Sequence, residues 1–375
     1  MKRLLFFILL LIVACKEKRA PQNHSISATD STSVKYAKGF TVDDYKAYKV
    51  LKVFNLDDKS KTYTYFLHKA GIKKPKNISY DYSIRIPINK VVLTSTTHIP
   101  PLILLNEENS LIGFPHLDYI SSPEIRTRID HHKITELGEN ENINFETLLS
   151  LQPDAMVGFT IDQNATYDNI LKSGIPIVFN RDWQENTPLG KAEWIKFFGA
   201  LFDKSSQADS IFTQIETNYN TAKQMISDTL KKPKILSGAM YKDVWYTPGG
   251  KSWAAQFIKD AGGDYLYKDT DETGSLSLSF ESVYESGREA DIWINPSEFT
   301  SLESLKNSSR HYTEFKPYKG KEIYSYADKK GATGGLFYFE EGPSRPDLIL
   351  KDLIHIFHPS LLPKDYKPTF YQVLK

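Results

Sequence analysis

The segment NFETLLSLQPDAMV (144–157) decides the fold, because the second half of the chain contains a counterpart, SFESVYESGREADIWI (279–294). Each segment predicts a short helix, an acidic turn and a buried strand. Asn144 and Ser279 are residue types that favour helix N-caps, and a glutamate in the first helical turn complements the helix dipole. The strands are apolar without alternation, as in sheets that are covered on both faces. One unit used twice, far apart in the sequence, predicts two similar lobes with a cleft between them.

Short strands alternate with helical segments around these two units, a rhythm that is typical of parallel α/β sheets. In the first half the predicted strands span residues 91–94, 111–114, 155–159 and 175–179. In the second half they span residues 234–237, 290–294 and 323–326. The predicted helices span residues 102–107, 145–151, 167–173, 253–261 and 347–357. We therefore expect an α/β protein with two Rossmann-like lobes, each built on a central sheet.

A helical stretch at about 189–229 separates the two series of strands. Its apolar residues recur at i, i+3 and i+4, which predicts amphipathic helices, and the polar residues 203–206 predict a break. The second helix would have about 24 residues and a length of roughly 36 Å. A helix of that length can reach from one lobe to the other, so we expect a single long interlobe helix.

The remaining segments complete the predicted domain organisation. Residues 16–35 are polar and lack an apolar period, which predicts a disordered tether. Alternating apolar residues on either side of a polar turn predict an N-terminal β-hairpin extension, assigned to residues 36–83. The N-terminal lobe, the helical segment and the C-terminal lobe are assigned to residues 84–187, 188–232 and 233–375.

Length and charge narrow the range of functions. A chain of 375 residues is long enough for two domains with substantial cores. The 47 Lys and Arg residues are balanced by 46 Asp and Glu residues. A polyanionic partner such as nucleic acid is therefore not expected, and we expect the protein to act as a monomer.

The N-terminus predicts export and lipid attachment. A short basic region at 1–3 is followed by an unbroken apolar run at 4–13, which is too short to span a bilayer. The run ends at Cys15, the only cysteine of the chain. This arrangement is typical of a signal peptide and resembles the bacterial lipobox, in which the cysteine is acylated after cleavage. We therefore expect residues 1–15 to be a signal peptide, and the mature protein to be anchored by lipid in the cell envelope or periplasm.

Several motifs, in order along the chain, resemble those of a known family. They are the two units described above, GIPIV (174–178), GKAEW (190–194), GGDY (262–265) and GPSRPD (342–347). Together with the lipoprotein signal and the interlobe helix, they resemble the class III periplasmic substrate-binding proteins of ABC importers. That family takes up iron–siderophore complexes, haem and cobalamin. The likeness covers about residues 84–374, so the predicted β-rich extension lies outside the usual core of the family.

The resemblance implies a binding protein that performs no chemistry and has no cofactor of its own. A ligand would be held between two lobes, which move little because the interlobe helix is rigid. In this family one surface glutamate on each lobe meets arginines of the permease, and the matching positions here are Glu146 and Glu281. Both glutamates would also be explained by their helix N-termini alone. The implied partners are the permease subunits of an ABC importer and a small metal chelate.

In open α/β sheets a ligand lies outside the carboxyl ends of the strands, so the turns that follow the predicted strands are the candidate binding positions. Aromatic side chains there could stack on a flat macrocycle or a catecholate, and arginines could pair with an anionic chelate or haem propionates. Either arginine could instead form a structural ion pair, and Arg345 beside two prolines is typical of a helix entrance. The candidates are Thr97, His98, Tyr119, Phe159, Arg181 and Trp183 in the first lobe, and Trp245, Tyr246, Tyr338 and Arg345 in the second.

Two histidines raise an alternative function. His98 and His116 follow strands and could provide an axial ligand to iron or cobalt, although a lone histidine is more often structural. They could also contribute to a receptor for a free Zn²⁺ or Mn²⁺ ion, which needs about four ligands from both lobes. The second lobe offers no histidine in a predicted cleft turn.

Two further alternatives are an envelope enzyme and a lipoprotein scaffold without a small ligand. The sequence contains no nucleophile elbow, Walker loop or His-Glu-x-x-His motif. The glycine-rich segment GATGG (331–335) lacks the strand–helix setting of a phosphate loop, and we expect it to be a flexible loop at the cleft. A lack of small-molecule binding would favour the scaffold.

Overall fold

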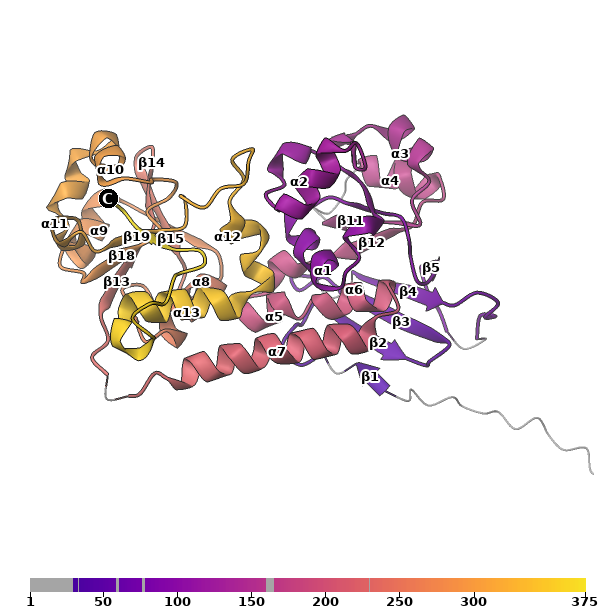
Figure 1. Ribbon diagram of the computed structural model, residues 1–375, viewed down its shortest axis with the longest axis horizontal. Coiled ribbons are helices and arrows are strands. Elements are labelled where there is room, and N and C mark those ends of the chain that lie inside the picture. Colours follow the sequence, from indigo (N-terminus) through magenta and orange to yellow (C-terminus); the bar gives the residue numbers. More distant parts are fainter. Residues whose placement is uncertain (1–29, 33, 59–60, 76–77, 160–164, 229) are drawn as a thin grey trace, which may run out of the picture.

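The computed structural model describes residues 30–375, apart from residues 33, 59–60, 76–77, 160–164 and 229. The predicted signal peptide, Cys15 and most of the predicted tether lie outside the described residues. Figure 1 shows two lobes side by side, with helix α7 (Ser205–Gln224) running beneath both. Within the described part of the chain, no helix is both long enough and apolar enough to cross a membrane.

The N-terminal lobe is built on a parallel sheet with the strand order β12-β11-β6-β7-β8. Its strands are β6 (Val91–Leu93), β7 (Leu111–Phe114), β8 (Thr135–Glu136), β11 (Ala155–Phe159) and β12 (Ile177–Asn180). The helices that connect them are α1 (Ile99–Leu104), α2 (Pro123–Asp130), α3 (Phe145–Leu151) and α4 (Ala165–Lys172). Each predicted strand and helix of this lobe is present, with shifts of up to three residues at its ends.

The C-terminal lobe repeats the pattern, with the strand order β16-β13-β18-β19-β20. Its strands are β13 (Lys234–Ser237), β16 (Asp264–Tyr265), β18 (Ile292–Ile294), β19 (Ile323–Ser325) and the antiparallel β20 (Gln372–Val373). A second, antiparallel sheet consists of β14 (Ala239–Tyr241), β15 (Val244–Pro248) and β17 (Ser275–Leu278). The helices are α8 (Trp253–Asp260), α9 (Phe280–Gly287), α10 (Leu302–Ser308), α11 (Lys316–Gly320), α12 (Phe337–Glu340) and α13 (Pro346–Phe357).

The two predicted units adopt the same local structure. The Asn144 side chain accepts a hydrogen bond from the Thr147 amide at 3.0 Å and caps α3, and Ser279 caps α9 in the same way. The acidic turns also have a common role. Asp154 accepts hydrogen bonds from the backbone just before β6, and Asp291 accepts one from the first residue of β13. Each acid therefore fixes its own strand beside the neighbouring parallel strand.

The helical stretch between the lobes forms α5 (Pro188–Ala192), α6 (Ile195–Leu201) and α7. The predicted break is confirmed, because Asp203 adopts a left-handed backbone with φ 55° and α7 begins at Ser205. Helix α7 has 20 residues and packs against α6 on one side and α13 on the other. Its first half buries Phe212 in the N-terminal core, and its second half buries Tyr219 in the C-terminal core. One helix thus enters the cores of both lobes.

The N-terminal extension is larger than the predicted hairpin. It is a five-stranded sheet, β1 (Asp30–Thr32), β2 (Phe40–Asp44), β3 (Tyr48–Phe54), β4 (Thr62–His68) and β5 (Tyr82–Arg85). The predicted hairpin corresponds to β3 and β4. One face of the sheet, with Leu51 and Tyr65, is buried in the same core as the N-terminal lobe. The Tyr65 hydroxyl also accepts a hydrogen bond from the Phe179 amide in β12 at 3.0 Å. The extension is therefore part of the N-terminal lobe.

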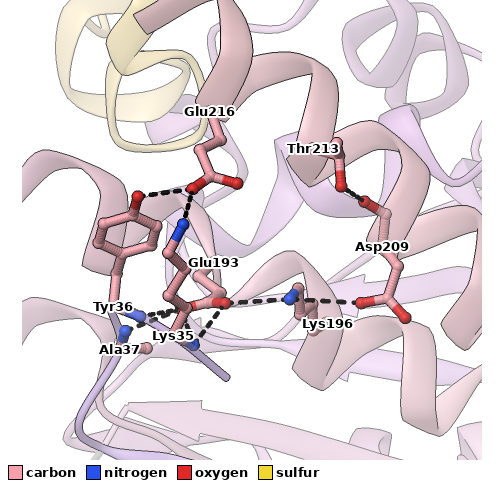
Figure 2. Close-up of polar contacts among 8 residues, drawn as sticks. All are labelled: Lys35, Tyr36, Ala37, Glu193, Lys196, Asp209, Thr213 and Glu216. Carbon is pink, nitrogen blue, oxygen red and sulfur yellow. Dashed lines mark hydrogen bonds and ion pairs between the residues drawn. The ribbon is translucent and has the colours of Figure 1, made fainter. Parts of the chain in front are cut away.

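The end of the predicted tether is also part of the fold. Strand β1 pairs with β2, and the backbone amides of Lys35, Tyr36 and Ala37 donate hydrogen bonds of 2.6–3.0 Å to the carboxylate of Glu193 (Figure 2). The Glu193 side chain is fully buried between α5 and α6 and also pairs with the Lys196 ammonium group at 3.0 Å. This carboxylate satisfies backbone donors that the segment could not pair within a strand or helix.

We predict that Glu193→Ala lowers the free energy of unfolding by about 3–5 kcal/mol, because it leaves three amides without their acceptor and removes one of the carboxylates that pair with the buried Lys196 ammonium group. Glu216→Ala is the matched control. Glu216 contacts the same segment through Lys35 and the Tyr36 hydroxyl but is partly open to solvent, so its loss should cost about 1 kcal/mol or less. Urea denaturation of both variants measures the difference, and equal losses would contradict the role assigned to Glu193.

Candidate ligand-binding cleft

The loops after the strands of the N-terminal sheet lie at the boundary between the lobes. The turn η1 (Thr96–His98) follows β6 and contacts α12 of the C-terminal lobe. The turns η3 (Leu117–Tyr119) and η4 (Asp182–Gln184) follow β7 and β12. Figure 1 shows α12 and the loop before it on the side of the C-terminal lobe that faces α1 and α2. The carboxyl edge of the sheet therefore faces the other lobe, as expected for a ligand cleft.

Polar groups link the lobes next to η4. The Thr97 hydroxyl donates a hydrogen bond to the Asp182 carboxylate at 2.8 Å. The Lys191 ammonium group donates to the Asp182 carbonyl oxygen at 2.9 Å and lies 5.5 Å from the centre of the Trp253 ring, which belongs to α8 of the other lobe. Burial lowers the pKa of Lys191, and the nearby acids Asp182 and Glu185 oppose this shift. A partly desolvated cation at this position suits an anionic ligand.

Lys191 and Trp253 were not among the predicted binding residues. Helix α5 contacts η4 of the N-terminal lobe and α8 of the C-terminal lobe, so a side chain on α5 can reach both. Lys191 does lie within the motif GKAEW that carries part of the family resemblance. That motif was the signal that could have identified it, whereas no local pattern marks Trp253.

Three of the predicted aromatic residues expose their rings. Tyr119 is 61% exposed, Trp183 51% and Tyr246 43%. The His116 ring, which is half-buried, stacks on Tyr119 with 4.7 Å between the ring centres. Phe159 is half-buried at the end of β11, directly before residues that the structure does not describe. Tyr119, Trp183 and Phe159 thus offer flat apolar surfaces at the strand ends, whereas Tyr246 lies within β15.

Two predicted aromatic residues belong to the C-terminal core. Trp245 is completely buried and stacks on Trp293, with 5.5 Å between the ring centres, and its indole nitrogen donates to the Ser237 carbonyl oxygen. Side chains alternate along β15, so Trp245 points inward while Tyr246 points outward. Tyr338 is also buried and stacks on Tyr326 at 4.3 Å. The prediction that both rings line an open cleft is therefore corrected: in this structure they are buried in core clusters of the C-terminal lobe.

The predicted His98 and Arg181 are also buried. His98 is completely inaccessible beside Phe198, and burial lowers its pKa, which favours the neutral ring. Arg181 is 1% exposed. Side chains in the turn after a strand can point into the core or toward solvent, and the sequence does not reveal which of them is buried. His98 in this conformation presents no face to an axial metal, so that expectation is corrected.

Arg345 forms an ion pair rather than an open anion site. Its guanidinium nitrogens Nε and Nη2 each lie 3.0 Å from an oxygen of the fully buried Asp347 carboxylate. This bidentate geometry consumes much of the donor capacity of the side chain. It agrees with the structural alternative left open by the sequence, a helix entrance at the start of α13.

The two predicted docking glutamates are both on the surface. Glu146 lies in the first turn of α3 and Glu281 in the first turn of α9, and both are exposed. Among the described residues, no group of three or more His, Cys, Asp or Glu side chains could hold a metal ion.

Comparison with known proteins agrees with this architecture. The chain is 27% identical over 300 residues to an uncharacterised lipoprotein of Methanocaldococcus jannaschii, a match that covers 77% of this chain and 69% of that protein. The fold resembles a possible iron-binding, periplasmic solute-binding protein of Staphylococcus epidermidis, with a TM-score of 0.57, 16% identity and coverage of 72% of this chain and 99% of that chain. It also resembles the periplasmic haem-binding protein HutB of Vibrio cholerae, with a TM-score of 0.55, 14% identity and coverage of 70% and 99%.

Residues 91–328, which include both repeated units and the interlobe helix, match the sequence model of a family described as periplasmic binding protein. The match covers well over half of the chain, and both lobes have the expected parallel sheets. The chain therefore belongs to the periplasmic binding protein family.

Proposed function

We propose that this protein captures a metal chelate, namely a ferric siderophore, haem or cobalamin, between its lobes and delivers it to an ABC permease. The observation that carries the proposal is the exposed Trp183 ring next to the partly desolvated Lys191, whose ammonium group donates to the Trp183 carbonyl oxygen at 3.3 Å at the lobe boundary. A flat ring supplies stacking area for a macrocycle or catecholate, and the ammonium group supplies charge for an anionic chelate. The descriptions of the similar structures, which name iron and haem, support the same ligand class.

The lipid anchor is part of the proposal. Two of the related proteins of M. jannaschii are named lipoproteins, at 27% and 23% identity. A lipid on Cys15, followed by a tether, would hold the binding protein near its permease and raise its local concentration there.

The proposed docking sites are Glu146 and Glu281. Each is an exposed acid on the first turn of a helix, in the two units that repeat between the lobes. Each glutamate would pair with a basic group of the permease, so the permease could contact both lobes at the same time. A scaffold lipoprotein would use the same surfaces without a ligand, so binding of a chelate separates the two functions.

We predict that the full-length protein in detergent binds one chelate saturably, and that Trp183→Ala weakens this binding roughly tenfold through the loss of stacking area. The measurement is tryptophan fluorescence with absorption spectra, using ferric siderophores, haemin, cyanocobalamin, Zn²⁺ and Mn²⁺. Phe145→Ala, which removes an exposed ring from α3, is the control and should bind normally. A response to Zn²⁺ or Mn²⁺ alone, or to nothing in the panel, would contradict the chelate proposal.

We predict that the double variant Glu146→Lys, Glu281→Lys binds the identified chelate normally but abolishes its uptake in cells, because the acids are replaced by repelling charges. The double variant Glu139→Lys, Glu285→Lys also changes one exposed acid on each lobe and should transport normally. Uptake by the first variant at the wild-type rate would refute the docking assignment.

A further inference from the structure

A carboxylate of one lobe caps a helix of the other. Glu340, in α12 of the C-terminal lobe, accepts a hydrogen bond from the Ser121 amide at 2.6 Å and another from the Ser122 amide at 2.9 Å. Ser122 is the N-cap residue of α2 in the N-terminal lobe, so its amide and the one before it have no acceptor within that helix. Glu340 is 2% exposed. The lobes are thus joined by a buried pair of hydrogen bonds.

The glycine-rich loop before α12 makes contacts with the same segment. The Thr333 hydroxyl donates to the Asp118 carbonyl oxygen at 2.6 Å. A Cβ atom added at Gly331 would lie 2.6 Å from the Ser121 Cα atom, and one added at Gly335 would lie 2.7 Å from the Tyr119 carbonyl oxygen. Such distances are too short for any residue with a Cβ atom. Glycine is therefore needed where the backbone of this loop packs directly against the backbone of the other lobe. The sequence predicted a flexible loop here, whereas the structure shows a loop seated on the other lobe.

The surroundings of Glu340 are not a closely packed interface. A cavity of about 210 Å³ lies beside it, lined by α1, α2, α12 and the residue before α13. Its walls include Ile103 and Pro123 of the N-terminal lobe and Phe337 and Glu341 of the C-terminal lobe. Because the adjoining surfaces are separated by this space, the contacts of Glu340 and the loop carry much of the attachment at this side of the cleft.

We propose that residues 330–340 form a latch, which holds the lobes closed on one side of the cleft and has to be released before they can part. The hinge layer of α5, α6 and α7 joins the lobes elsewhere (Figure 1). Opening would then break the two Glu340 hydrogen bonds, the Thr333 hydrogen bond and the glycine contacts together. The latch rests on these contacts alone and does not depend on the ligand class proposed above.

The latch also has a titratable group at its centre. Burial raises the pKa of Glu340 to about 7, and the Ser121 and Ser122 amides oppose that shift. The titratable and charged groups that line the same cavity are Glu341 on its own helix, Glu124 on α2 and Arg345 before α13, and His98 is the titratable residue of η1, which packs against α12. An exposed glutamate titrates near 4.5, so closure takes up a proton between about pH 4.5 and 7. The contribution of Glu340 to the closed state is therefore complete at low pH and is lost as the pH rises through 7.

The test compares full-length wild-type protein with Glu340→Ala. Hydrogen exchange followed by mass spectrometry should show roughly tenfold or faster exchange at the Ser121 and Ser122 amides, since each loses its hydrogen-bond acceptor. Spin labels on cysteines introduced at Lys133 and Lys306, one on each lobe, should report longer interlobe distances. Single-cysteine samples identify any signal that involves Cys15. Glu341→Ala, which leaves the two amide hydrogen bonds in place, is the matched control and should behave as wild type.

A second variant keeps the proposal testable if Glu340→Ala does not fold. Gly331→Val should also lengthen the interlobe distances, because its side chain cannot fit against Ser121, and circular dichroism checks that both variants are folded. Folded Glu340→Ala and Gly331→Val proteins with wild-type exchange and distances would overturn the latch, as would an equal effect of Glu341→Ala.

We predict that wild-type interlobe distances shorten between pH 8 and pH 5.5, and that this shift disappears in Glu340→Ala because the titrating carboxyl is gone. The same spin-labelled pairs measure it. A pH response that survives in Glu340→Ala would assign the effect to another group and contradict the role of Glu340.

Discussion

The carboxylate of Glu193 is the interaction on which the arrangement of the lobes depends. It gathers three successive backbone amides of residues 35–37 and the Lys196 ammonium group in a site that water does not reach. The neighbouring Glu185 does the same for the amides of Lys38 and Gly39. The start of the described chain is thereby attached to the helices between the lobes. Tyr36, held at this point, packs against the cores of both lobes.

This attachment explains how the protein can have two separate lobes and still a rigid connection between them. Helix α7 contributes to both cores, and the extension sheet shares the N-terminal core, so little rearrangement is expected within the hinge layer. The lobes otherwise meet mainly at α12 and its preceding loop, where directional contacts of Glu340 lie beside a cavity. A stiff base and a small, breakable contact at the cleft suit a protein that holds a preformed ligand and releases it through a modest lobe motion.

Local patterns were sufficient for most of the fold. The N-caps Asn144 and Ser279, the apolar strands after them and the amphipathic α7 act over a few residues, so their signals survive in the sequence. The size of the N-terminal extension was missed because its inner face is completed by the N-terminal lobe, and a strand's alternation does not say what will cover it. The part of the tether that the structure describes was missed for a similar reason: its partner, Glu193, lies 156–158 residues away along the chain.

The sequence by itself determined the class of architecture and the positions of the strand-end turns, because both follow from periodicity and from the rule for parallel sheets. It also identified Tyr119 and Trp183 as side chains at those turns, and their rings are exposed, as is that of Tyr246, which lies inside β15 instead of in a turn. Only the tertiary structure decided which candidates are accessible. Trp245 and His98 have the same residue chemistry as open binding groups, yet they complete cores, and Arg345 is paired with Asp347. Burial and pairing depend on what other segments bring to a site, and the meeting of Glu340 with Ser121 across the cleft is set by the whole fold.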